Sequence, residues 1–89
     1  MDKSGVERLM AAVVEQAYKD YKLALLNYNT KRRREDIEQA KNTIGECELF
    51  FQKNCDAFTN ISGEKIMKVA RAQVKETLDR RGIRMKEVV

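Results

Sequence analysis

The side chains that could do chemistry in this chain are carboxylates, two thiols and many amines and guanidines, and histidine is absent. Without an imidazole the chain forms no Ser–His or Cys–His nucleophile pair, and it lacks the usual nitrogen ligand for metals. Cys47 and Cys55 stand eight residues apart, a spacing that makes no zinc site without histidine. The glycines stand singly at positions 5, 45, 63 and 82, so there is no glycine-rich phosphate loop.

Two carboxylates, Glu46 and Glu48, flank a cysteine in the stretch "ECE". On a helix, residues two positions apart point about 200° away from each other. These two side chains therefore cannot act together as a general acid and a general base. We expect a protein that is not an enzyme, with no catalytic residues, no metal ligands and no cofactor.

The stretch "TKRRRED" (30–36) raises the question of phosphate binding. If Thr30 caps the second helix, residues 31–34 fill its first turn, where the helix dipole disfavours each cation by about 0.3–1 kcal/mol. Such broken local rules are mildly enriched at functional sites. The cluster can also neutralise itself through pairs four residues apart, namely Lys31–Glu35, Arg32–Asp36 and Arg34–Glu38. We favour the self-paired, solvated turn, and the phosphate contact stays open as the alternative.

A second basic set lies on one flank of the third predicted helix and comprises Lys65, Lys68, Arg71 and Lys75. The polar face of an amphipathic helix explains this flank equally well. The preceding helix, about 25 residues long, is too long for a helix-turn-helix, so nothing indicates sequence reading. The candidate phosphate contacts are Arg32, Arg33, Lys68, Arg71 and Lys75.

Three helices have to position these side chains. Apolar residues recur at spacings of three and four over 5–28, 34–58 and 63–81, which predicts a helix in each range. Ser4 and Glu7 form a capping box for the first helix, and Asn60 or Ser62 caps the third. Gly82 can take the left-handed conformation that ends the third helix, and we expect 83–89 to be a frayed tail.

These helices predict a single all-α domain over 1–89. Because a short turn joins the first two long helices, we expect a three-helix bundle built on a long antiparallel hairpin. Gly45 costs about 1 kcal/mol of helix propensity relative to alanine, which favours close approach of a neighbouring backbone. No apolar run reaches the ~18 residues that cross a membrane. Cys47 and Cys55 would lie about 12 Å apart along one helix, so we expect reduced thiols and a cytoplasmic protein.

Several apolar residues fall outside the buried stripes. Leu26 and Leu49 point away from the predicted core, and Leu23 and Phe50 lie on its flanks. Together they form a candidate interaction face for self-association or for a protein partner, with isolated surface leucines as the alternative. Among the tyrosines, we expect Tyr18 to be exposed, while Tyr21 and Tyr28 lie at the edge of the core.

Three short motifs carry a resemblance. "DYKLAL" (20–25), "ECELFF" (46–51) and "ISGEKIM" (61–67) occur in this order, and the chain resembles short uncharacterised helical proteins of Gram-positive phages and prophages. The likeness covers roughly residues 15 to 70, and "NTKRRRED" departs from the Asn- and Pro-containing turn of that group. The resemblance implies a mobile-element origin and a location in the cytoplasm of a bacterial host. It carries no activity and no functional residues.

These observations favour a non-enzymatic helical protein that acts by protein–protein binding, as an adaptor or as an inhibitor of a host or phage machine. The alternative is an accessory nucleic-acid-binding protein that contacts phosphates through its basic surface. The net charge of +4 permits an acidic partner of either kind without requiring one.

Overall fold

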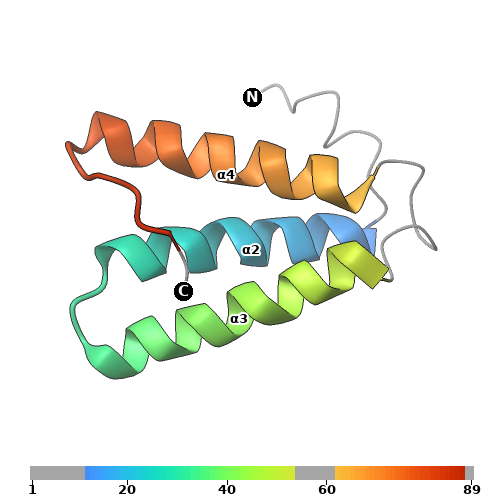
Figure 1. Ribbon diagram of the computed structural model, residues 1–89, viewed down its shortest axis with the longest axis horizontal. Coiled ribbons are helices and arrows are strands. Elements are labelled where there is room, and N and C mark those ends of the chain that lie inside the picture. The colour runs from blue at the N-terminus through green and yellow to red at the C-terminus, as the bar shows by residue number, and fades with distance from the viewer. Residues whose placement is uncertain (1–11, 54–61, 88–89) are drawn as a thin grey trace.

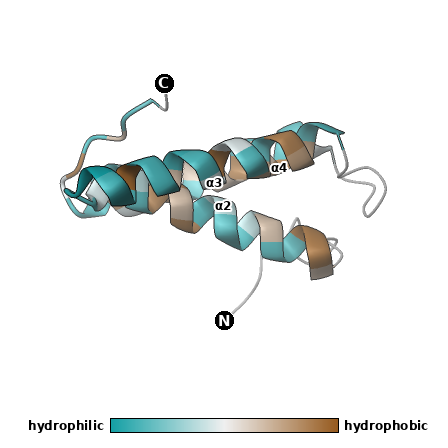
Figure 2. Cartoon of the chain, turned by 90° about the horizontal axis from the view of Figure 1, so that it is seen from below, coloured by the Kyte–Doolittle hydropathy of each residue, from teal (hydrophilic) through white to brown (hydrophobic). Residues whose placement is uncertain are grey.

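The computed structural model describes residues 12–53 and 62–87. Over these ranges the chain forms three helices, α2 (Ala12–Thr30), α3 (Arg34–Lys53) and α4 (Gly63–Arg80), and no strand (Figure 1). The helices pack together as a bundle, in which α3 and α4 lie at one level and α2 at another (Figure 2). The all-α class is therefore confirmed for the described residues. The predicted cap at Ser4 and the predicted helix over 54–58 lie outside them.

The core follows the predicted apolar stripes. On α4 the four residues at successive helical turns are all buried, with exposed fractions of 4% or less: Ile66, Ala70, Val74 and Leu78. On α3 the buried stripe is Ala40, Ile44, Cys47 and Phe51. α2 packs against both other helices, and its Tyr21 meets Phe51 of α3 edge to face at 5.6 Å between ring centroids.

α3 begins at Arg34, the residue from which the sequence predicts the second long helix, whereas α2 runs two residues past its predicted end at 28. Thr30 does not cap α3, because it is the last residue of α2 and its hydroxyl donates back to the Leu26 carbonyl at 2.8 Å. Residues 31–33 form the loop, and α3 begins only at Arg34. Glu35 and Asp36 occupy the first turn of α3, where carboxylates complement the helix dipole. The four cations would fill that turn only if Thr30 capped α3, and of the four only Arg34 lies within the helix.

Both ends of α4 depend on a glycine. At the start, a Cβ on Gly63 would overlap the backbone carbonyl of Phe51, so α4 can approach α3 only through a glycine. At the other end Gly82 has φ = 72°, and the Gly82 and Ile83 N–H groups donate to the carbonyls of Asp79 and Leu78. This is a Schellman motif, as the sequence predicted.

The tail after α4 is docked through residue 87, so the frayed tail expected from the sequence was wrong there. Ile83 and Met85 pack against the core. The Lys86 N–H donates to Asn29 Oδ1 at 2.6 Å, and the Asn29 amide in turn donates to the Leu25 carbonyl at 2.7 Å. One buried side chain at the end of α2 thus holds an extended segment that has no helical pattern of its own.

Candidate protein-binding grooves

A polar bridge joins all three helices. Tyr21 of α2 donates to Glu48 Oε2 of α3 at 2.7 Å, and Arg71 of α4 donates to both, through Nε to the Tyr21 hydroxyl at 2.9 Å and through Nη2 to Glu48 Oε2 at 2.7 Å. Burial raises the pKa of Tyr21 far above its ordinary value, and the hydrogen bond to Glu48 raises this pKa further. The hydrogen bond to Glu48 also raises the pKa of Arg71. A phenol held protonated in this way is no general base, so we interpret the bridge as a link between helices.

A second polar link joins α2 to α4. The Tyr18 hydroxyl donates to Gln73 Oε1 at 2.8 Å, and Lys22 Nζ donates to the same oxygen at 3.0 Å. The Lys22 ammonium also lies 4.4 Å from the centroid of the Tyr18 ring. Tyr18 is 0% exposed, so the expectation of an exposed tyrosine was wrong. Its ring is covered by the contact between α2 and α4 and offers no stacking surface.

A groove of about 710 Å³ lies between α3 and α4. In this α3–α4 groove the lining residues come from all three helices and the tail: Leu25, Lys41, Ile44, Gly45, Glu48, Arg71, Ala72, Lys75, Met85, Lys86 and Glu87. Arg71 also lines a second hollow of about 640 Å³ that contains Phe51, Met67 and Lys68. The Arg71–Glu48 ion pair therefore lies across the space between α3 and α4.

Gly45 has no close neighbour among the described residues. A Cβ built on it would meet none of them within 4 Å, so no described backbone approaches it as the sequence led us to expect. Gly45 is exposed and lines the α3–α4 groove. The missing side chain leaves an open notch in the α3 wall of that groove.

The candidate phosphate contacts fall into two separate groups. Lys68, Arg71 and Lys75 are exposed and line the hollows between α3 and α4, although Arg71 is already paired with Glu48. Arg32 and Arg33 are exposed in the α2–α3 loop, at the end of the bundle where α4 finishes (Figure 1).

The local neutralisation predicted for the stretch 30–36 is only partly present. Arg34 pairs with Glu38 at 4.0 Å. Within the described ranges, neither Lys31–Glu35 nor Arg32–Asp36 comes within ion-pair distance. The basic loop is therefore less self-paired than its spacing suggests.

The sequence missed two lysines that the fold adds to the groove, Lys41 from α3 and Lys86 from the tail. The only signal for Lys41 was its spacing, four residues before Gly45 and seven before Glu48, which places all three along one helix flank. Lys86 continues the basic charge of the third helix toward the tail in the sequence, but the tail has no periodicity that would place it in the groove.

The candidate interaction face is not one surface. Leu23 and Leu49 are 57% and 52% exposed, but they lie on different helices, and Leu49 lines none of the hollows described here. Leu26 and Phe50 are half-buried and pack against the core, where Phe50 meets Phe51 at 5.7 Å between centroids. Of the four, Leu23 is the side chain that stands at the rim of a hollow and remains open to solvent.

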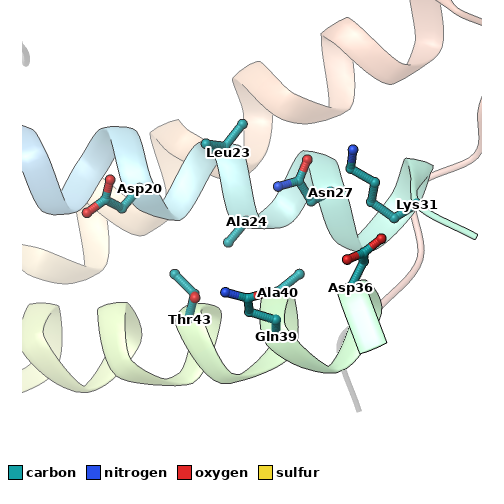
Figure 3. A pocket seen from close by; sticks show the side chains of 9 residues that line it. All are labelled: Asp20, Leu23, Ala24, Asn27, Lys31, Asp36, Gln39, Ala40 and Thr43. Carbon is teal, nitrogen blue, oxygen red and sulfur yellow. The ribbon is translucent and has the colours of Figure 1, made fainter. Parts of the chain in front are cut away.

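Leu23 lies between two hollows. One of about 330 Å³, between α2 and α4, is lined by Lys19, Lys22, Leu23, Leu26, Gln73, Val74 and Thr77. The other, of about 240 Å³ between α2 and α3, includes two carboxylates, Asp20 and Asp36 (Figure 3). Figure 3 shows these carboxylates toward opposite ends of the hollow, so they do not converge on one atom. We therefore interpret the surface around Leu23 as a ridge suited to contact rather than catalysis.

The remaining features to consider in the described part of the chain are metal ligands, the cysteine thiol and membrane spans. No group of three or more Cys, Asp or Glu side chains there could hold a metal ion. Burial raises the pKa of the Cys47 thiol to about 11, so it stays protonated near neutral pH. Cys55 lies outside the described residues. No described helix combines the length and apolar character needed to cross a bilayer.

Comparison of the chain with protein-family models, with curated proteins and with solved structures finds no match. Its function therefore has to be argued from the surface itself.

Proposed function

We propose that this protein acts by binding another protein, as an adaptor or an inhibitor, and that it catalyses no reaction. The observation that carries the proposal is the position of Leu23, which is 57% exposed on the ridge between the α2–α3 and α2–α4 hollows. A large apolar side chain open to water beside concave surfaces is typical of a docking site. Tyr21, Glu48 and Arg71 could resemble catalytic groups, but their side chains bond to one another and link the three helices.

The origin and the detailed architecture belong to the same proposal. The motifs around Tyr21, Cys47 and Ile66 support a phage or prophage protein that works in the cytoplasm of a bacterial host. A loop of three residues between α2 and α3 supports the long antiparallel hairpin, because short connections join antiparallel neighbours.

The test is affinity purification of the tagged chain from bacterial cells, with Leu23→Glu and Leu49→Glu as a matched pair. Both leucines are more than half exposed, so neither charge should disturb the core, and circular dichroism would verify this. We expect a stoichiometric partner to co-purify with wild type and with Leu49→Glu, and to be lost with Leu23→Glu. Absence of any such partner, or a partner indifferent to Leu23, would refute the proposal. Leu26→Glu is unsuitable because Leu26 packs on the core.

The alternative function is accessory nucleic-acid binding. It is favoured by Arg32 and Arg33, whose exposed side chains have no carboxylate partner among the described residues. If they contact phosphates, Arg32→Ser with Arg33→Ser should weaken retention on DNA or RNA and reduce the salt slope by about 2. No retention at low salt would remove this alternative.

A further inference from the structure

The α3–α4 groove is concave and apolar at its base, and the function proposed for Leu23 does not use it. Leu25 of α2 and Ile44 of α3 lie beneath its floor and are only 2% and 1% exposed. Met85 of the chain's own tail is partly buried, lines the groove and packs against the core. The groove therefore already accepts an apolar side chain from a segment that is not part of the helices.

The rim of this groove is cationic. Lys41, Lys75 and Lys86 come from α3, α4 and the tail, and all three are exposed. Within the described part of the chain, none of them has a carboxylate at ion-pair distance. Glu48 is occupied by Arg71, which leaves Glu87 as the opposing charge in the lining. A concave surface with unpaired charges of one sign attracts a partner of the other sign.

The walls of the groove carry small residues where a partner would have to come close. Gly45 on α3 leaves an open notch, and Ala72 on α4 is exposed on the other wall. Gly45 is unfavourable inside a helix by about 1 kcal/mol relative to alanine, and no contact within the described chain makes use of it. Small residues of this kind let a second backbone approach a helix closely.

We propose that the α3–α4 groove docks an amphipathic helix of a partner protein, one that presents carboxylates on either side of an apolar stripe. The apolar stripe would cover Met85 and Ala72, the carboxylates would pair with the lysines, and the helix would cross at Gly45. Nucleic acid fits less well, because the lining has no aromatic side chain on which a base could stack. The site is separate from Leu23, so an adaptor would have two faces.

The test uses a fluorescein-labelled helical peptide of about 18 residues, with leucines at i, i+3, i+4 and i+7 and glutamates beside them. A twin peptide carries lysine in place of each glutamate. Fluorescence anisotropy with the full chain should show saturable binding of the glutamate peptide and none of the lysine twin. Lys41→Glu combined with Lys75→Glu should weaken binding on the order of tenfold, since two ion pairs become repulsive. Gly45→Leu, which fills the notch, should weaken it at least as much.

Two matched controls decide whether the groove is responsible. Lys65→Glu changes the same charge on the exposed face of α4 outside the groove, and Leu23→Glu changes the other proposed site, so neither should alter peptide affinity. If circular dichroism shows that Gly45→Leu unfolds α3, Ala72→Leu fills the opposite wall instead. No binding of the glutamate peptide at millimolar protein in low salt would overturn the proposal. Equal binding of both peptides, or an equal effect of Lys65→Glu, would overturn it too.

A single-stranded oligonucleotide that competes with the glutamate peptide for the lysines, and is unaffected by Gly45→Leu, would assign the groove to nucleic acid instead. Because the Leu23 experiment measures co-purification of a cellular partner and this one measures peptide affinity in isolation, either proposal can fail while the other stands.

Discussion

Alanine substitution should act in opposite directions at two glycines of this bundle, Gly45 and Gly63. Both lie in helices, so sequence alone predicts a gain at each. In the structure, a Cβ on Gly45 meets nothing within 4 Å, whereas a Cβ on Gly63 would overlap the backbone of Phe51. The two sites therefore separate helix propensity from packing.

The expected magnitudes follow from these surroundings. Gly45→Ala should raise the free energy of unfolding by about 1 kcal/mol, because propensity is the only thing that changes. Gly63→Ala should lower it by about 1–3 kcal/mol, since the backbone of α3 or α4 must shift to admit the methyl group. Gly63 is also the first residue of α4, where little helix propensity is gained.

The assay is urea and thermal unfolding followed by circular dichroism, with equal slopes as the check on two-state behaviour. A change of 1 kcal/mol corresponds to a shift of roughly 4–8 °C in Tm for a domain of this size. If Gly45→Ala is less stable than wild type, or if the stabilities of both variants shift in the same direction, then the surroundings assigned to these glycines are wrong. Destabilisation by Gly45→Ala would also contradict the open notch in the α3 wall of the α3–α4 groove.

Three further predictions concern buried polar and titratable groups. Asn29→Ala should release the tail, lower stability by about 1–2 kcal/mol through the lost bond to Lys86 N–H, and speed tryptic cleavage after residue 84. Tyr18→Phe should cost about 1 kcal/mol in urea unfolding, because its buried hydroxyl loses a hydrogen bond at 2.8 Å, while Tyr28→Phe, whose bond is 3.4 Å long, should cost nothing measurable. The thiol of Cys47 has its pKa raised from 9.0 to about 11 by burial, so the folded state holds this proton more tightly. The contribution of this thiol to stability is therefore complete below pH 9 and is lost as pH rises toward 11. Cys47→Ala should therefore make the free energy of unfolding decline less steeply between pH 9 and 11. An unchanged slope in the variant would contradict this assignment.

The buried stripes could be predicted because each depends on a single helix. Ile66, Ala70, Val74 and Leu78 recur at every turn of α4, and a helix that packs on one side buries such a row. α2 is different because most of the contacts between helices involve it, with α3 and with α4. Tyr18 lies beside the predicted stripe, and the contact with α4 buries it.

The end of α2 and the tail were misjudged because local rules compete there. Thr30 fits an N-cap, but the same hydroxyl can bond back to the carbonyl four residues earlier, and that bond extends α2 instead. The tail lacks any pattern of its own, yet Asn29, 57 residues before Lys86, supplies the acceptor that holds it. Nothing in the local sequence of 83–87 contains that information.

The same limit applies to the groove, and it changes how the basic residues should be understood. Arg71 belongs to a basic flank in the sequence, but in the fold it stands beside Glu48 and its charge is balanced there. The positive character of the groove instead comes from Lys41, Lys75 and Lys86, which no helical spacing brings together because they lie on three different segments. Since paired charges contribute little to long-range attraction and unpaired ones in a concave site contribute most, the partner's sign is set by these lysines rather than by Arg71. Neutralising Arg71 would loosen the bridge between helices, whereas neutralising the lysines would alter the recognition proposed here and leave the bundle intact.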